Sequence, residues 1–172
     1  MRRSNAKRSF HLIWLGIACV LFSASLVFAR YHRPSLTASE ESAIRILISR
    51  WVEAYQDLDA KRLAALETPD VEIVDRYGEL HLPSGRNENE KLWSDAFEIV
   101  SRNTLPPTVT IDRIRFLRPD VAVLQVSWRF TEGILLVDRD RIPPFSQVDT
   151  FVVIKSQSAW LVAAHVMQEK KP

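Results

Sequence analysis

Hydrophobic positions along this chain change their spacing twice. Residues 10–29 form an uncharged, largely apolar run. Between residues 37 and 101 most apolar positions recur about every 3.6 residues, which predicts helices, and from Thr108 onward they alternate, which predicts strands. Helices first and antiparallel strands last indicate an α+β fold rather than a parallel α/β sheet.

Three helices are predicted in the middle of the chain. Thr37 and Glu40 have the spacing of a capping box, which opens the first helix. Its apolar stripe is Ile44, Leu47, Ile48, Trp51, Tyr55 and Leu58. Asp59 is the expected N-cap of a short second helix that Pro69 ends. A third helix is expected over residues 90–101, after a polar loop.

Strands account for most of the remaining chain. A short strand is expected over residues 71–75, with a returning strand near 79–82. Four longer strands are predicted over 108–116, with a bulge near Arg113, and over 121–131, 147–155 and 160–168. Residues 132–145 contain Gly133 and two consecutive prolines, so they are expected to form an irregular connection or a partial strand.

The first 33 residues are expected to be a targeting segment and linker, followed by one domain over residues 34–172. Four basic residues precede the apolar run of 10–29, as in an export signal. The run is long enough to span a bilayer, which predicts an uncleaved anchor, and cleavage after Ala29 is the alternative. The domain is therefore expected on the extracytoplasmic side of the cell membrane, or secreted or periplasmic if the segment is cleaved.

Charge is distributed unevenly between these two parts. Five of the 23 basic residues and none of the 21 acidic residues lie in residues 1–30. The rest of the chain therefore has 18 basic and 21 acidic residues, a formal charge of −3. This balance argues against a nucleic-acid partner. The one cysteine, Cys19, lies in the apolar run, so no disulfide or thiol chemistry is expected in the domain.

Several soft motifs between Ser39 and Gln168 resemble the nuclear-transport-factor-two-like superfamily, in its SnoaL-like and ketosteroid-isomerase-like branch. The residues that carry the resemblance are Ala43-Ile44, Trp51, Ala54-Tyr55, Asp59, Leu63, Leu66, Pro69-Asp70-Val71, Gly85-Arg86, Pro119 to Val123, and Trp160 to His165. The resemblance implies a cone-shaped curved antiparallel sheet wrapped around the N-terminal helices, with a pocket at its mouth. It also implies a homodimer. Some members are cofactor-free isomerases, dehydratases or cyclases, and others are binding or scaffold modules.

Three ionisable residues are candidate catalytic groups. His165, which alternation places with Leu161, Ala163 and Met167, is a candidate proton carrier near neutral pH, and the alternative is a core histidine bonded to backbone or a carboxylate. Asp149 interrupts an apolar strand and is a candidate partner, unless it faces water at a sheet edge. Asp75 is a third candidate or a turn cap.

Four aromatic residues are candidate ligand contacts: Tyr55, Trp51, Trp93 and Trp128. Spaced aromatics on amphipathic elements also form ordinary core, which is the alternative. Tyr55 carries a hydroxyl that needs a partner and would suit a developing oxyanion.

No cofactor or metal site is expected, because the four histidines show no paired spacing and no glycine-rich phosphate loop is present. Two functions therefore remain. One is an exported or anchored pocket domain for a hydrophobic small molecule, with acid–base chemistry of the isomerase or dehydratase kind. The other is a non-catalytic periplasmic scaffold that uses its sheet face for protein contacts; a filled interior would favour it.

Overall fold

The computed structural model describes residues 38–75, 78, 80–81 and 86–170, with the backbone alone at 80, 81 and 86. The predicted targeting segment of residues 1–33 and the capping residue Thr37 lie outside this range. No helix in the described part is long and apolar enough to cross a membrane. The anchor, its cleavage and the membrane partner therefore stay predictions.

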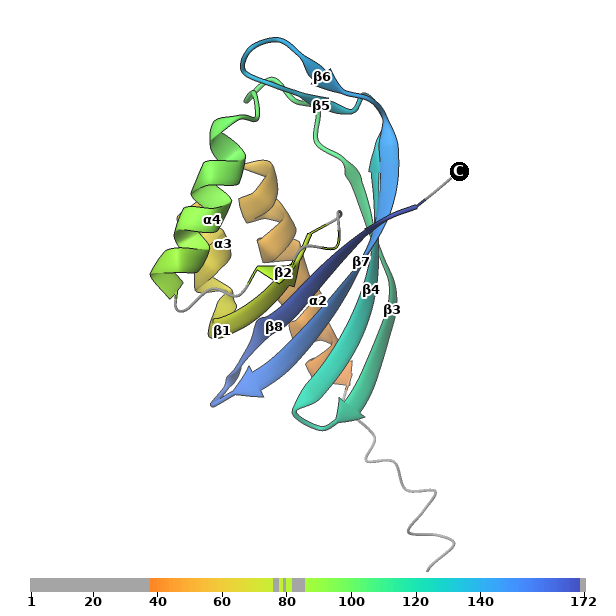
Figure 1. Ribbon diagram of the computed structural model, residues 1–172. Coiled ribbons are helices and arrows are strands. Elements are labelled where there is room, and N and C mark those ends of the chain that lie inside the picture. Colours follow the sequence, from red (N-terminus) through yellow and green to blue (C-terminus); the bar gives the residue numbers. More distant parts are fainter. Residues whose placement is uncertain (1–37, 76–77, 79, 82–85, 171–172) are drawn as a thin grey trace, which may run out of the picture. The chain divides into compact units, whose positions relative to one another are not determined.

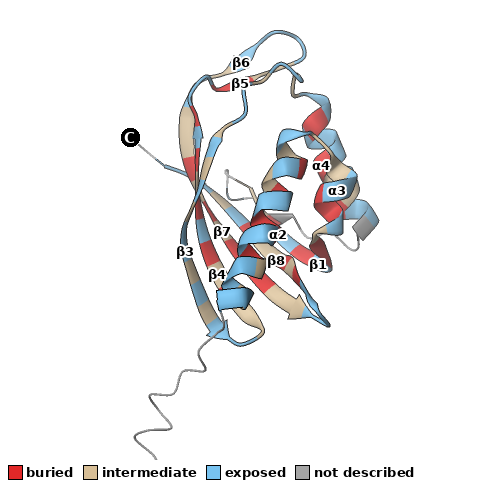
Figure 2. Ribbon diagram, turned by 180° about the vertical axis from the view of Figure 1, so that it is seen from behind, coloured by how far each residue is buried: buried red, intermediate tan, exposed pale blue. Residues whose placement is uncertain are grey.

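Three helices pack on one side of a curved sheet (Figures 1 and 2). They are α2 (Ala38–Gln56), α3 (Ala60–Ala65) and α4 (Arg86–Glu98). The predicted stripe of the first helix is confirmed for Ile44, Leu47, Ile48 and Trp51, which α2 buries together with Ala54, whereas Tyr55 is half-buried and Leu58 lies beyond the end of the helix. Glu40, however, accepts hydrogen bonds from Lys155 Nζ (2.7 Å) and Trp160 Nε1 (2.8 Å), which tie the start of α2 to the sheet.

The boundaries of the next two helices differ from the prediction. Asp59 caps α3 as expected, accepting from the Arg62 backbone N–H at 2.9 Å. The helix ends before Pro69, because residues from Glu67 onward already belong to a strand. α4 begins four residues earlier than predicted, with Glu88 in its first turn, where an acid stabilises the helix dipole.

The main sheet has the strand order β2-β1-β8-β7-β4-β3. Its strands are β1 (Glu67–Val74), β2 (Leu80–His81), β3 (Thr108–Arg118), β4 (Val121–Phe130), β7 (Phe145–Ser156) and β8 (Ala159–Glu169). Neighbours are antiparallel, except that β1 runs parallel to β8. The expected α+β class with a curved sheet around the N-terminal helices is confirmed, and the single parallel pair is the departure from an all-antiparallel sheet.

The irregular connection predicted over residues 132–145 contains a small hairpin, β5 (Ile134–Leu135) and β6 (Arg141–Ile142), beyond one end of the sheet (Figure 1). Gly133 has a positive φ of 68°, and an added Cβ there would lie 2.8 Å from the Pro143 carbonyl carbon. Only glycine fits this close approach. The predicted bulge in β3 is confirmed by the register shift between Ile111 and Arg113.

Buried side chains lie where the sheet and the helices face each other (Figure 2). β4 and β7 alternate between buried and more exposed positions, so one face of each strand belongs to the core. The core is rich in aromatic rings, with Trp51 of α2 at its centre. This interior is where a functional site has to be sought.

Candidate functional site

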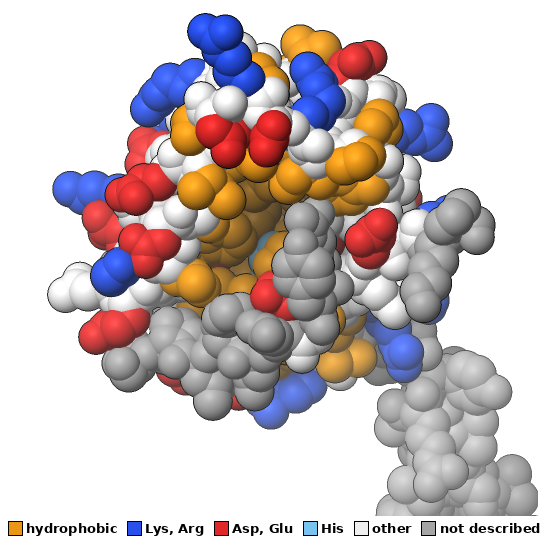
Figure 3. Space-filling model, turned by 45° about the horizontal axis from the view of Figure 1, so that its top comes forward, with side chains coloured by type: hydrophobic (Ala, Val, Ile, Leu, Met, Phe, Trp, Pro, Cys, Tyr) orange, Lys and Arg blue, Asp and Glu red, His pale blue; other side chains and the backbone are white. Residues whose placement is uncertain are grey.

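A cavity of about 200 Å³ lies between the helices and the inner face of the sheet. Figure 3 shows hydrophobic side chains around a hollow, with the pale blue of a histidine inside it. Its lining residues are Trp51, Tyr55, Asp75, Trp93, Ala96, Phe97, Val100, Trp128, Phe130, Ile134, Phe145, Gln147, Asp149, His165 and Met167. An apolar cavity with few polar groups is the usual form of a small-molecule site.

All four aromatic residues predicted as ligand contacts line this cavity. Trp51 contacts the other three rings. It stacks on Tyr55 with ring centroids 5.9 Å apart and 9° between planes. It also meets Trp93 and Trp128 edge to face, with centroids at 5.6 and 6.1 Å. Through these contacts the rings are also part of the core. The four aromatic residues are therefore both core residues and lining residues of the cavity.

His165 and Asp149 form a buried pair in the cavity wall. The His165 Nε2 lies 2.9 Å from the Asp149 Oδ2, and both side chains are 1% exposed. Asp149 is on the fourth of six strands in the sheet order, so the alternative of a water-facing edge aspartate is wrong. His165 was expected either to line a pocket or to be a core histidine bonded to a carboxylate. In the structure it does both, because it bonds to Asp149 and lines the cavity.

A β-bulge in β8 determines which way His165 faces. Val152 pairs with Ala164 and Val153 pairs with Val162, which leaves Ala163 without a partner on β7. Trp160 and Val162 are therefore buried before the bulge, and His165 after it. The prediction that Leu161 and Ala163 share the face of His165 is wrong for this reason, whereas Met167 does line the cavity with it.

Gln147, which the sequence reasoning missed, completes the pair. Its Nε2 lies 3.0 Å from Asp149 Oδ1 and 3.3 Å from Oδ2. Gln147 is two residues before Asp149 and on the same face of β7, so strand alternation contained the signal. Both partners of Asp149 can donate, which is the arrangement that an ionised carboxylate requires.

This geometry fixes the tautomer of His165. A carboxylate only accepts hydrogen bonds, so Nε2 carries the proton and Nδ1 of the neutral ring carries the lone pair. Within the described part of the chain, Nδ1 has no hydrogen-bond partner. The ring lies against Phe151, with centroids 4.3 Å apart and 7° between planes. His165 is therefore oriented by Asp149 as a base with an unused nitrogen.

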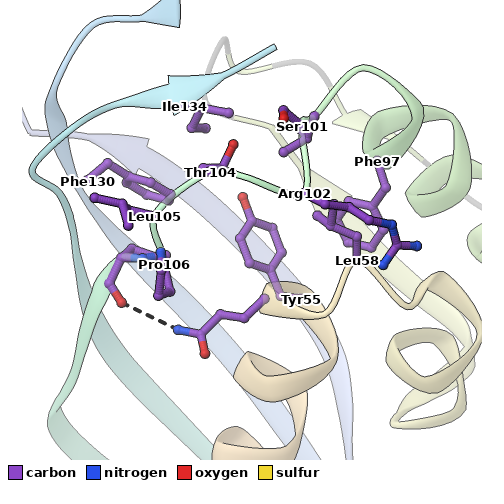
Figure 4. Close-up of a pocket in the computed structure, with 13 residues that line it drawn as sticks. Tyr55, Leu58, Phe97, Ser101, Arg102, Thr104, Leu105, Pro106, Phe130 and Ile134 are labelled. Atoms are coloured by element: carbon purple, nitrogen blue, oxygen red, sulfur yellow. Dashed lines mark hydrogen bonds between the residues drawn. The ribbon is translucent and has the colours of Figure 1, made fainter. Parts of the chain in front are cut away.

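The remaining predicted site residues also lie at the cavity. Asp75 follows β1, two residues after Ile73, which pairs with His165, and it lines the same cavity. Tyr55 lines both this cavity and a smaller hollow of about 50 Å³. Figure 4 shows its hydroxyl pointing toward Thr104 in that hollow, where Gln56 Nε2 also donates to the Pro107 carbonyl at 3.4 Å.

A second buried acid, Glu67, lies outside the cavity lining and was not predicted as a site residue. It accepts from Trp51 Nε1 at 3.1 Å and from the side-chain amide of Asn89. Burial raises the pKa of Glu67 to about 8, partly opposed by the hydrogen bond from Trp51. Its neighbours Leu66 and Pro69 made the segment look like a helix end, so no pattern marked the glutamate as buried.

Among the side chains that the structure describes, no group of three or more His, Cys, Asp or Glu residues is placed to hold a metal ion.

Comparison with known proteins places the fold. A ketosteroid isomerase-like protein from Erwinia carotovora atroseptica SCRI1043 superposes with a TM-score of 0.68 at 16% identity, covering 78% of this chain and 99% of that one. A proposed scytalone dehydratase from Novosphingobium aromaticivorans DSM 12444 gives 0.62 at 14% identity, covering 79% and 87%. An NTF-2-like protein of unknown function from Shewanella oneidensis MR-1 gives 0.59 at 16%, covering 75% and 98%.

No protein-family model matches the chain. No curated protein matches it either. The structural likeness confirms the fold that the sequence resemblance implied, namely that of ketosteroid isomerase-like and NTF2-like structures. At these identities it says nothing about the reaction, which has to be argued from the cavity.

Proposed function

We propose that this chain, which has the nuclear-transport-factor-two-like fold, binds a small hydrophobic molecule and moves a proton on it without a cofactor. The observation that carries the proposal is the buried His165–Asp149 pair in the wall of an apolar cavity. A pair of this kind is how enzymes hold a histidine in the tautomer of a general base.

The reaction class follows from a base with an unused nitrogen in a residue that lines the cavity. His165 Nδ1 would take a proton from the carbon next to a ligand carbonyl, so that the C–H bond breaks and an N–H bond forms. The electron pair moves to the carbonyl oxygen as an enolate. Return of the proton to another carbon gives isomerisation, and its delivery to a departing hydroxyl gives dehydration.

The negative oxygen of such an enolate needs a donor in the wall. The Trp128 indole N–H is a candidate, because it has no hydrogen-bond partner in the described residues and belongs to a lining residue. The Tyr55 hydroxyl, which is the donor predicted from the sequence, points instead toward Thr104 in the smaller hollow. Asp75 at the same cavity is the candidate for a second proton carrier.

Two features bound the ligand. The volume of about 200 Å³ is below the range of about 300–1,000 Å³ that is usual for drug-sized ligands, so a small molecule is expected. The lining is mostly aromatic and aliphatic, so the ligand should be largely apolar.

The cavity also favours this function over the scaffold alternative, for which a filled interior was expected.

Deuterium exchange at the saturated carbon beside the carbonyl of 2-cyclohexenone tests the proposal in the full-length chain, because only this α carbon carries a proton that enolate formation removes. We expect catalysed exchange that His165→Gln reduces by about a hundredfold, because a positioned base typically contributes about 10²–10⁴. Asp149→Asn should give a smaller loss, because the ring stays in place with its tautomer no longer fixed. Val166→Ala, on the adjacent exposed position, is the control. Exchange that is equally fast in His165→Gln would refute the proposal.

A further inference from the structure

Glu67 is fully buried at the start of β1 and takes no part in the proposed proton transfer. Uncharged groups face it: Trp51 from α2, Asn89 and Trp93 from α4, and Val162 as its partner on β8. No basic side chain forms an ion pair with it in the described part of the chain. A buried carboxyl without a cationic partner is costly, which calls for a physical reason.

Two of the residues that face Glu67, Trp51 and Trp93, line the cavity. Trp51 donates its indole N–H to the Glu67 carboxyl, 3.1 Å from Oε1. The Trp93 indole N–H is buried without a hydrogen-bond partner among the described residues, and its influence on Glu67 is to lower the pKa of that carboxyl against the larger effect of burial. The Trp51 indole therefore presents its polar edge to Glu67 while its ring lines the cavity, and the Trp93 ring, in edge-to-face contact with Trp51, lines the cavity as well.

These same two rings enclose His165. The Trp51 ring meets the His165 ring edge to face with centroids 5.0 Å apart. The Trp93 ring is nearly parallel to it, at 22° and 6.2 Å. A rotation of either indole would therefore change the space around the imidazole and the shape of the cavity.

We propose that Glu67 is a positioning residue of the cavity: its carboxyl group holds the Trp51 indole, and through it the neighbouring rings of Trp93 and His165. The proposal rests on the proposed function for its consequence on ligand binding, but not for the positioning itself. Asn89 extends the arrangement to α4, so one carboxyl group links two helices and the first strand behind the cavity.

A neutral carboxyl group suits this role better than an apolar side chain. It accepts the Trp51 N–H on one oxygen and donates its own proton from the other. The Asn89 Oδ1 has no partner among the described residues, and a 180° turn of that amide would bring it to this proton. The raised pKa of Glu67 keeps the neutral form populated at neutral pH.

The test follows the indole N–H resonances of the ¹⁵N-labelled full-length chain between pH 6 and 10, with Trp51→Phe and Trp93→Phe to assign them. The Trp51 resonance should shift with a midpoint near pH 8 in the wild type. In Glu67→Gln, whose amide oxygen still accepts, it should keep its position but lose the pH dependence. Glu72→Gln, an exposed acid on the same strand, is the matched control and should titrate like the wild type.

The functional consequence is measured with 2-cyclohexenone as the probe. At pH 7, Glu67→Gln should bind it within about twofold of the wild type, and Glu67→Leu at least fivefold more weakly. The proposal is overturned if the Trp51 resonance does not shift with pH in the wild type, or if it still titrates in Glu67→Gln. This comparison of the wild type with Glu67→Gln tests the proposal even if Glu67→Leu does not fold. Normal titration without any binding of the probe to the wild type refutes the proposed function and leaves the positioning role standing.

Discussion

Replacing His165 with Ala is expected to lower the free energy of unfolding by about 3 kcal/mol or more. The reason is that Asp149 would stay buried with Gln147 as its one remaining partner among the described side chains. Removing one member of a buried pair leaves a desolvated carboxylate, which costs more than the lost contact itself. Urea unfolding of the full-length chain measures the change.

The double variant separates this effect from a simple loss of packing. His165→Ala together with Asp149→Ala should cost about 1–3 kcal/mol less than the sum of the two single changes, because no unpaired charge is left. Val166→Ala, whose side chain is 38% exposed next to His165, should change stability by less than about 0.5 kcal/mol. Additive single and double values would show that the pair is not coupled.

The second large effect is a pH dependence of stability that originates at Glu67. Its pKa rises from 4.5 to about 8 on folding. Between these values the folded chain keeps a proton that the unfolded chain has lost, so the stability due to this proton is present below about pH 4.5 and lost as the pH rises to about 8. At about 1.4 kcal/mol per pH unit, the loss between pH 5 and 8 amounts to at most about 4 kcal/mol.

Glu67→Gln removes this titration, so the stability of the variant relative to the wild type should rise by up to about 4 kcal/mol between pH 5 and pH 8. The comparison is made by urea unfolding at several pH values, with Glu72→Gln as the variant that should follow the wild type. Parallel curves for Glu67→Gln and the wild type would mean that Glu67 already ionises in the folded chain as it does in the unfolded one.

The parts of the fold that follow from repeating patterns were predictable from the sequence. The stripe of α2, the cap at Asp59 and the alternation of β4 each depend on local spacing, and the structure has them. The start of α4 was missed because an inward-facing residue of its first turn, Asn89, is polar. Asn89 is buried because it bonds to Glu67, which is distant along the chain. Periodicity does not register a buried polar position of this kind.

The candidate site was predictable in its residues and not in its geometry. Asp149 lies on the core face of β7 with Phe151, two residues away, as strand alternation allows. In β8 the bulge at Ala163 shifts the alternation, so that His165 faces the core. An alanine gives no sign in the sequence that a bulge occurs there. The pairing of two strands, which brings Asp149 and His165 together, is a long-range property that a single sequence does not specify.

Glu67 shows the same limit more strongly. Its surroundings come from α2, α4 and β8, which are separated along the chain, and its own neighbours Thr68 and Pro69 suggest a turn. Only the assembled core shows that this acid is enclosed by aromatic and amide N–H groups. The residues with the most unusual physical chemistry are therefore the ones for which sequence reasoning had the least to work with.

The most direct test of the pocket function is a titration of the full-length chain with 2-cyclohexenone, followed by NMR at the His165 imidazole and the Trp128 and Trp160 indoles. If the cavity is a ligand site, the His165 and Trp128 resonances should shift in a saturable way. Trp160, which bonds to Glu40 outside the cavity lining, should stay unchanged. No saturable shift at His165, or an equal shift at Trp160, would contradict the pocket function.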